Sequence, residues 1–352
     1  MTTAAMPTLR PLGLGELLDQ AIRLYRRNFF KFIGIVAVVQ VPLALIQFLV
    51  SISAFERFLY ADMQDPADLT MATFSSLGQT VLIAVLSLIL VQGVATAALT
   101  RAIADSRLGQ PTGILEAYRK IGSAWSRLIG ALLLIMLLAI GLLIWMLVPC
   151  IGWFTGPGML AVLGFLVSPL VAPVIVLESK SATQAIRRAW DLARRRFWWM
   201  LGFVLILSLL GQFIITGPSL LIGGALGAFS VSTLELTQVD VVQAMTQSLT
   251  TLVLGLIYLP LQLTAITLLY FDLRVRTEGL DLALQSESIA GQPVDFSNLI
   301  AHAPPASSGG VVTGTEMAYF ALLTVGFVFF YMIVFGILTI LGMVLFSAGG
   351  AF

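Results

Sequence analysis

Long apolar runs separated by short charged segments dominate the chain. Seven runs have a middle without charged residues or histidine: 29–53, 77–100, 128–149, 157–177, 198–228, 248–271 and 317–347. A helix of about 20 apolar residues crosses the roughly 30 Å hydrocarbon layer of a bilayer. The pattern therefore predicts an all-α fold, a polytopic transmembrane helix bundle.

Positive charge is distributed very unevenly over the segments between these spans. Of the 19 lysine and arginine residues, 18 fall in the N-terminal segment or just after the second, fourth and sixth spans. Only Arg57 falls on the other side, whose loops carry Glu56, Asp62, Asp65, Asp68, Glu235 and Asp240. The positive-inside rule then predicts a cytoplasmic N-terminus and an extracytoplasmic C-terminus.

The composition changes at residues 284–316, which are rich in proline, glycine and serine and lack a long apolar run. We expect a flexible cytoplasmic linker there. It would separate a six-span membrane domain, residues 1–283, from a single C-terminal transmembrane helix, residues 317–352. Within the fifth span, Gly217 and Pro218, with the glycines at 223, 224 and 227, predict either a break or the close approach of another helix.

Three charged segments that precede odd-numbered spans share one spacing. Ala21, Ala117 and Ala189 each precede an aromatic residue by eight positions and a glycine by thirteen. In the first segment, apolar and charged residues fall on opposite sides of a helix. We therefore expect cytoplasmic amphipathic helices in the headgroup plane, with arginines near anionic lipid. The simpler alternative is that they only set the orientation and stiffen the entry to each span.

The most distinctive polar segment, YFDLRVRTEGLD at residues 270–281, ends the sixth span. On a helix, Asp272 faces Arg276, and Arg274 faces Glu278. These charges either form local pairs or join a cytoplasmic polar cluster that locks the spans together. The candidate cluster consists of Glu16, Asp19, Arg23, Glu178, Arg187, Asp272, Arg274, Arg276 and Glu278.

Three stretches resemble a bacterial family, the membrane domain of glycerophosphoryl diester phosphodiesterase. They are RPLGLGELLD at residues 10–19, PVIVLE at residues 173–178, and the segment at 270–281. The resemblance covers about residues 8–283 and implies a bacterial inner-membrane protein. Family members that are enzymes carry a fused (β/α)₈ barrel with paired histidines and metal-binding carboxylates. This chain has one histidine, His302, and no room for a barrel, so no catalytic residue carries over.

Composition narrows the function further. A net charge of +1 gives no indication of nucleic-acid binding, and a single cysteine, Cys150, excludes an internal disulfide and a multi-cysteine metal site. We expect no catalytic residue, cofactor or metal. We expect a non-enzymatic protein that interacts with membrane lipids, anionic ones included, or scaffolds a partner protein or a second copy in a membrane or envelope process. The alternative is a transporter of a neutral or lipid-like substrate, and an intramembrane enzyme ranks last.

Overall fold

The computed structural model describes residues 10–60, 65–110, 113–230, 236–283 and 312–349, which are almost entirely helical and contain no strand. The predicted all-α fold is confirmed. In chain order the elements are α1 (Leu14–Arg27), α2 (Phe29–Tyr60), α3 (Pro66–Ser87), the π-helix η1 (Leu88–Ala95), α4 (Thr96–Arg107), α5 (Ile114–Lys120), α6 (Ala124–Trp145), α7 (Ile151–Val162), the π-helix η2 (Leu163–Val167), α8 (Ser168–Glu178), α9 (Ala182–Arg194), α10 (Phe197–Ser230), α11 (Leu236–Glu278) and α14 (Gly314–Gly349).

Six stretches of the described chain are long and apolar enough to cross a membrane. They are Phe29–Val50, Thr70–Arg107, Ala124–Trp145, Ile151–Glu178, Phe197–Ile222 and Leu252–Glu278. They correspond to the first six predicted spans, so the polytopic bundle is confirmed. The second and sixth run on into charged sequence, because charged residues that find partners do not interrupt helical hydrogen bonding.

The fifth span is one continuous helix, since α10 passes Pro218 without a break. A Cβ on Gly217 would meet nothing within 4 Å, so this glycine brings no other helix close. The close approach occurs at Gly211, where the ring of Tyr258 from α11 occupies the space that a side chain would need. The Tyr258 hydroxyl donates to the carbonyl of Leu207 at 2.6 Å, which fixes α10 against α11.

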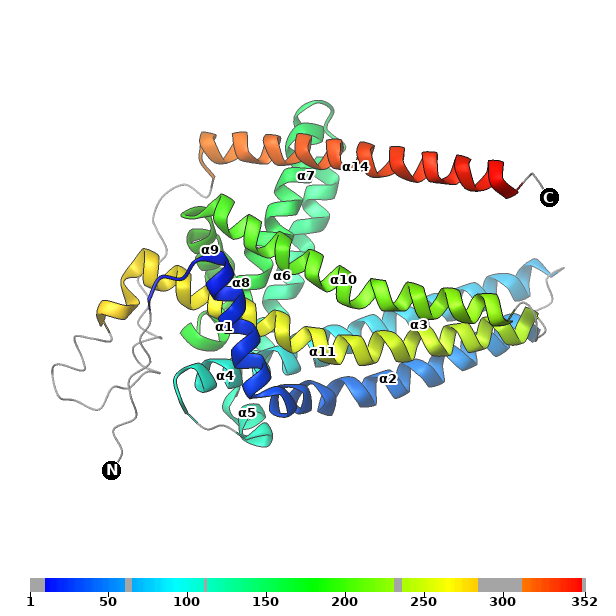
Figure 1. Ribbon diagram of the computed structural model, residues 1–352, viewed down its shortest axis with the longest axis horizontal. Coiled ribbons are helices and arrows are strands. Elements are labelled where there is room, and N and C mark those ends of the chain that lie inside the picture. The colour runs from blue at the N-terminus through cyan, green and yellow to red at the C-terminus, as the bar shows by residue number, and fades with distance from the viewer. Residues whose placement is uncertain (1–9, 61–64, 111–112, 231–235, 284–311, 350–352) are drawn as a thin grey trace.

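Two groups of spans meet at one end of the molecule (Figure 1). The helices α2, α3, α10 and α11 extend in a common direction, whereas α6 and α7 run across it. The shorter helices α1, α4, α5, α8 and α9 gather where the two groups meet. We call this the basic end, because these helices, the residues next to them in the chain and the ends of the spans beside them carry 18 of the 19 lysines and arginines.

The best-buried part of the core also lies at the basic end. Leu99, Leu170 and Leu269, from three different spans, are completely buried there. Farther along α10, Leu209 and Phe213 are 67% and 80% exposed. Apolar side chains tolerate such exposure in a membrane, because lipid tails are as apolar as leucine.

The three predicted amphipathic segments form α1, α5 and α9, and each leads into a span. Each begins with the same hydrogen bond, from the backbone N–H before the helix to the side chain three residues later. The pairs are Gly13 with Glu16 (3.2 Å), Gly113 with Glu116 (3.3 Å) and Ser181 with Gln184 (3.4 Å). Ala21, Ala117 and Ala189 are all buried. The repeated spacing thus marks a repeated structural unit, an entry helix followed by a span.

The apolar side of α1 packs on protein, contrary to the expectation that it lies on lipid. Leu17, Ala21 and Tyr25 are buried, and α1 contacts α11 along its length. The Tyr25 hydroxyl donates to the carbonyl of Ile257 at 2.9 Å, and burial raises the pKa of Tyr25 to about 12. Because its apolar side is covered by a span, α1 presents mainly its charged side to the surroundings.

The last helix, α14, begins on the core, whereas the sequence predicted a separate single span. Its residue Thr324 accepts a hydrogen bond from the backbone N–H of Gly158 in α7 at 2.9 Å. The ring of Phe320 lies 6.1 Å from that of Trp190, and the ring of Tyr319 lies 5.1 Å from that of Phe197. The predicted linker, 284–316, falls mostly outside the described residues. Whether α14 crosses the membrane stays a prediction.

Candidate functional site: a buried charge cluster

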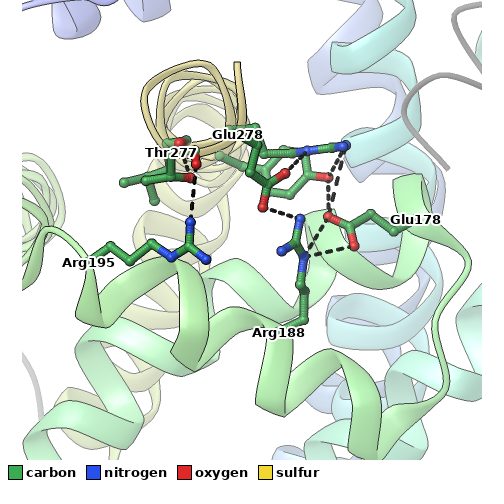
Figure 2. Close-up of polar contacts among 8 residues, drawn as sticks. Glu178, Arg188, Arg195, Thr277 and Glu278 are labelled. Atoms are coloured by element: carbon green, nitrogen blue, oxygen red, sulfur yellow. Dashed lines mark hydrogen bonds and ion pairs between the residues drawn. The ribbon is translucent and has the colours of Figure 1, made fainter. Parts of the chain in front are cut away.

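Two arginines and two glutamates meet where α8, α9 and α11 pack together (Figure 2). Arg188 of α9 lies between the glutamates, 3.1 Å from Glu178 of α8 and in an ion pair with Glu278 of α11. Arg274, one turn before Glu278, pairs with it at 3.0 Å. All four side chains are 5% exposed or less. With Tyr270 these residues form what we call the charge cluster.

Tyr270 joins the two halves of the charge cluster. Its hydroxyl donates to Glu178 Oε1 at 2.8 Å and accepts a hydrogen bond from Arg274 at 3.1 Å. The guanidinium of Arg274 also lies 4.0 Å from Glu178. The two positive and two negative charges balance, and each is held by at least two partners. A buried ionic group that is balanced and hydrogen-bonded fixes the relative positions of the elements that carry it.

The helix geometry explains how this sequence assembles the charge cluster. Tyr270, Arg274 and Glu278 recur every four residues and so share one face of α11. Glu178 is the last residue of α8, and Ser179 after it adopts a left-handed conformation, with φ 54°, that ends the helix. Gly279 (φ 64°) ends α11 in the same way.

A second set of contacts, which we call the N-terminal clasp, holds the segment before α1. Asp272 accepts a hydrogen bond from the backbone N–H of Leu12 at 2.7 Å and pairs with Arg276 at 2.8 Å. Arg276 in turn donates to the carbonyl of Leu12. Both backbone polar groups of Leu12 are therefore bound by residues 260 and 264 positions later in the chain. Beside the clasp, Arg195 donates to the carbonyl of Thr277 at 3.1 Å (Figure 2).

Another buried carboxylate, Asp105, lies near the end of α4. Its side chain is 2% exposed and lies 3.1 Å from both Arg101 and Lys120. Lys120 belongs to α5 and also pairs with Glu116 at 3.0 Å. The hydrogen bond to Glu116 raises the pKa of Lys120, and Asp105 acts in the same direction. Asp105 therefore fastens α5 to the span that precedes it.

Three of the buried carboxylates, Asp105, Glu178 and Asp272, share one structural role. Each lies at the basic end of an even-numbered span, and each binds the following entry helix or the residues just before it. Asp105 binds α5 and Glu178 binds α9. Asp272, in the last of the six spans, binds Leu12 ahead of α1, so the third connection returns to the beginning of the chain. The six spans are thus fastened as three repeats in a closed ring.

The structure places the nine candidate residues in different surroundings. Glu178, Arg274 and Glu278 belong to the charge cluster, and Asp272 and Arg276 to the adjacent clasp. Glu16 instead pairs with Arg10 at 3.0 Å on the surface, where its bonds to Gly13 and Arg10 lower its pKa. Asp19, Arg23 and Arg187 are not in the cluster either, because they lie on the outward sides of α1 and α9.

The sequence interpretation missed Arg188, Tyr270, Asp105 and Lys120. It selected the neighbouring residue Arg187 instead of Arg188. The helical spacing of Ala185, Arg188, Ala189 and Leu192 would have identified the correct arginine, since these positions share one face. All four are buried. In the described part of the chain, no three His, Cys, Asp or Glu side chains are grouped so as to hold a metal ion.

Residues 170–291 match the family model for the membrane domain of glycerophosphoryl diester phosphodiesterase. The resemblance seen in the sequence is therefore confirmed over these residues. The match includes every residue of the charge cluster, as well as Asp272 and Arg276. The stretch at residues 10–19 lies outside it. Comparison of the chain with curated proteins and with solved structures gave no match.

Proposed function

We propose that this chain is a non-enzymatic protein of the bacterial inner membrane that binds anionic lipid at its basic end. The observation that carries the proposal is the outward side of α1, where Arg23, Arg26 and Arg27 are exposed. They surround a shallow hollow of about 550 Å³ together with Asp19 and Ile22. Within the described residues, no carboxylate lies within ion-pair distance of these three arginines.

The position of these arginines favours lipid as the ligand. Arg27 is the last residue of α1, and the first span begins two residues later at Phe29. Phe30 is 87% exposed, as suits an aromatic residue at a membrane boundary. Unpaired cations at this depth lie level with lipid phosphates, which attract Lys and Arg. By contrast, the arginines of the charge cluster and the clasp already pair with carboxylates of the protein.

The lipid proposal is tested by the triple substitution Arg23→Gln, Arg26→Gln, Arg27→Gln. The protein is reconstituted in phosphatidylcholine vesicles, and spin-labelled phosphatidylglycerol and phosphatidylcholine report which lipid contacts it. We expect the natural protein to select phosphatidylglycerol and the variant to lose at least about fivefold of that selectivity. High salt should have a similar effect, because it screens exposed charges.

The matched control is Arg119→Gln, Lys180→Gln, Arg187→Gln, which removes the same charge from the basic end outside α1. It should keep most of the selectivity. If both triple variants lose selectivity equally, the effect reflects overall charge, and the assignment to α1 is wrong.

The orientation proposed for the protein is a cytoplasmic basic end and an extracytoplasmic C-terminus. It rests on the distribution of lysine and arginine, and alkaline phosphatase fusions test it. Since this enzyme is active only outside the cytoplasm, we expect activity from fusions after Asp65, Asp240 and Phe352. Fusions after Arg119 and Arg194 should be inactive, and activity at either position would refute the proposed topology.

A transporter of a neutral or lipid-like substrate is the second candidate. The π-helices η1 and η2, in the second and fourth spans, favour it, because π-helical segments often occur at functional sites. The charge cluster favours the non-enzymatic lipid-binding protein over a transporter. Its balanced, paired charges hold α8, α9 and α11 in fixed positions. Substrate flux in proteoliposomes that depends on η1 or η2 would favour transport.

A further inference from the structure

A second hollow lies behind α1, between its end, the end of α4 and the start of α5. It measures about 620 Å³, and polar side chains line much of it. Its polar lining residues are Arg27, Asn28, Lys31, Ser106, Gln110 and Glu116. These residues come from the first two repeats, so the hollow exists only because the repeats pack together.

Lys31 is the distinctive residue of this hollow. It lies in the first turn of α2, where the first span begins, and its ammonium donates to the Ser106 hydroxyl at 3.0 Å. An ammonium group has three N–H donors. Within the described residues, no carboxylate lies within 4 Å of this ammonium. Lys31 therefore keeps donors for a ligand in the hollow, and the guanidinium of Arg27 lines the same space.

The part of the hollow formed by α5 carries a negative charge, on Glu116. Glu116 pairs with Lys120 at 3.0 Å and accepts from the backbone N–H of Gly113 at 3.3 Å. These bonds lower the pKa of Glu116, so it is a carboxylate at neutral pH. Two cations from α1 and α2 and a carboxylate from α5 line the hollow, and they fit a ligand with a phosphate at one end and a hydrogen-bond donor at the other. The start of a membrane span forms one edge of the hollow, so such a ligand can keep its acyl chains in the bilayer.

We propose that this hollow binds one anionic phospholipid, with the lipid phosphate at Arg27 and Lys31 and the polar end of the headgroup toward Gln110 and Glu116. The proposal rests on the proposed function, since it names a specific site for the anionic lipid attracted to α1. It differs in that one lipid is held in a defined place, whereas the outward arginines of α1 act on lipids in general.

The test uses the full chain, stripped of lipid in a non-ionic detergent, and native mass spectrometry to count bound lipids. Dioleoylphosphatidylglycerol is titrated in mixed micelles, with dioleoylphosphatidylcholine as the comparison lipid. We expect one phosphatidylglycerol to bind more tightly than the rest. Lys31→Gln should weaken this first binding step roughly tenfold, because it removes a charge-assisted hydrogen bond. Lys180→Gln, the matched control, should bind as the natural protein does.

Ser106→Ala is the second variant. If Lys31→Gln does not fold, this variant tests whether the hollow binds the lipid. It leaves every charge in place and removes only the hydroxyl that holds Lys31, so we expect first-step binding to weaken roughly threefold. Unchanged first-step affinity in the folded Lys31 or Ser106 variant would overturn the proposal. Displacement of the lipid by excess inorganic phosphate would also overturn it, because the ligand would then be a soluble phosphate.

These variants keep all three arginines of α1, so the two proposals fail separately. If lipid selectivity depends on the α1 arginines but the first binding step is insensitive to Lys31 and Ser106, the proposed function stands and this site is wrong. If the first binding step depends on Lys31 while the α1 triple variant keeps its selectivity, the site stands at Lys31 without Arg27, and the role of the α1 arginines is wrong.

Discussion

Replacing Arg188 by methionine is expected to destabilise the folded protein by about 3–5 kcal/mol, the usual cost of removing one partner from a buried ion pair. Arg188 is 3% exposed and bridges Glu178 and Glu278. Without it, two buried carboxylates from different helices face each other with one fewer cation between them. The loss is measured as the apparent melting temperature and as the fraction of monodisperse protein after heating in detergent.

The neighbouring residue gives a close control, since Arg187 belongs to the same helix and carries the same charge but is exposed. Arg187→Met should change stability by less than about 1 kcal/mol, as is usual for surface charges. A small effect at Arg188, equal to that at Arg187, would mean that the charge cluster does not hold α8, α9 and α11 together.

The second large effect is expected where α14 crosses α7. A Cβ on Gly158 would overlap the backbone carbonyl of Phe320, so even alanine forces α14 to move. The movement would also break the hydrogen bond from Gly158 to Thr324. We expect Gly158→Ala to lower stability by about 1–3 kcal/mol, as overpacking usually does, and to expose the start of α14 to limited proteolysis.

Gly202 of α10 provides the comparison, because a Cβ there would meet nothing within 4 Å. Gly202→Ala should leave stability unchanged or raise it by about 0.5–1 kcal/mol, since alanine favours a helix over glycine. If both alanine variants behave alike, the tight crossing of α7 and α14 does not contribute to stability.

Local regularities made much of this architecture predictable. An apolar stretch long enough to span a bilayer must form a helix there, because only a helix satisfies its backbone polar groups within one segment. The six spans could therefore be located from hydrophobicity alone. Two ion pairs within α11, Asp272 with Arg276 and Arg274 with Glu278, could also be predicted. Residues four positions apart face each other on a helix.

The resemblance between segments was informative about elements but misleading about individual side chains. The spacing of Ala21, Ala117 and Ala189 correctly indicated three related entry helices, all with the marked alanine buried. The same comparison did not show which arginine of α9 turns inward: the candidate cluster included Arg187, whereas Arg188 is the buried residue. A short motif fixes residue types, whereas the direction of a side chain depends on which side of the helix its neighbours cover.

By itself, the sequence determined the helical class, the first six spans, the uneven distribution of charge and the entry helices, because each depends on residues close together in the chain. Only the tertiary structure decided which charges meet. Arg188 reaches Glu278 across 90 positions, and Leu12 reaches Asp272 across 260, through the packing of whole helices. The same packing turned the apolar side of α1 toward α11 and placed the start of α14 on α7. Such contacts depend on how helices approach in space, and helical periodicity gives the face of each helix but not the partner that covers it.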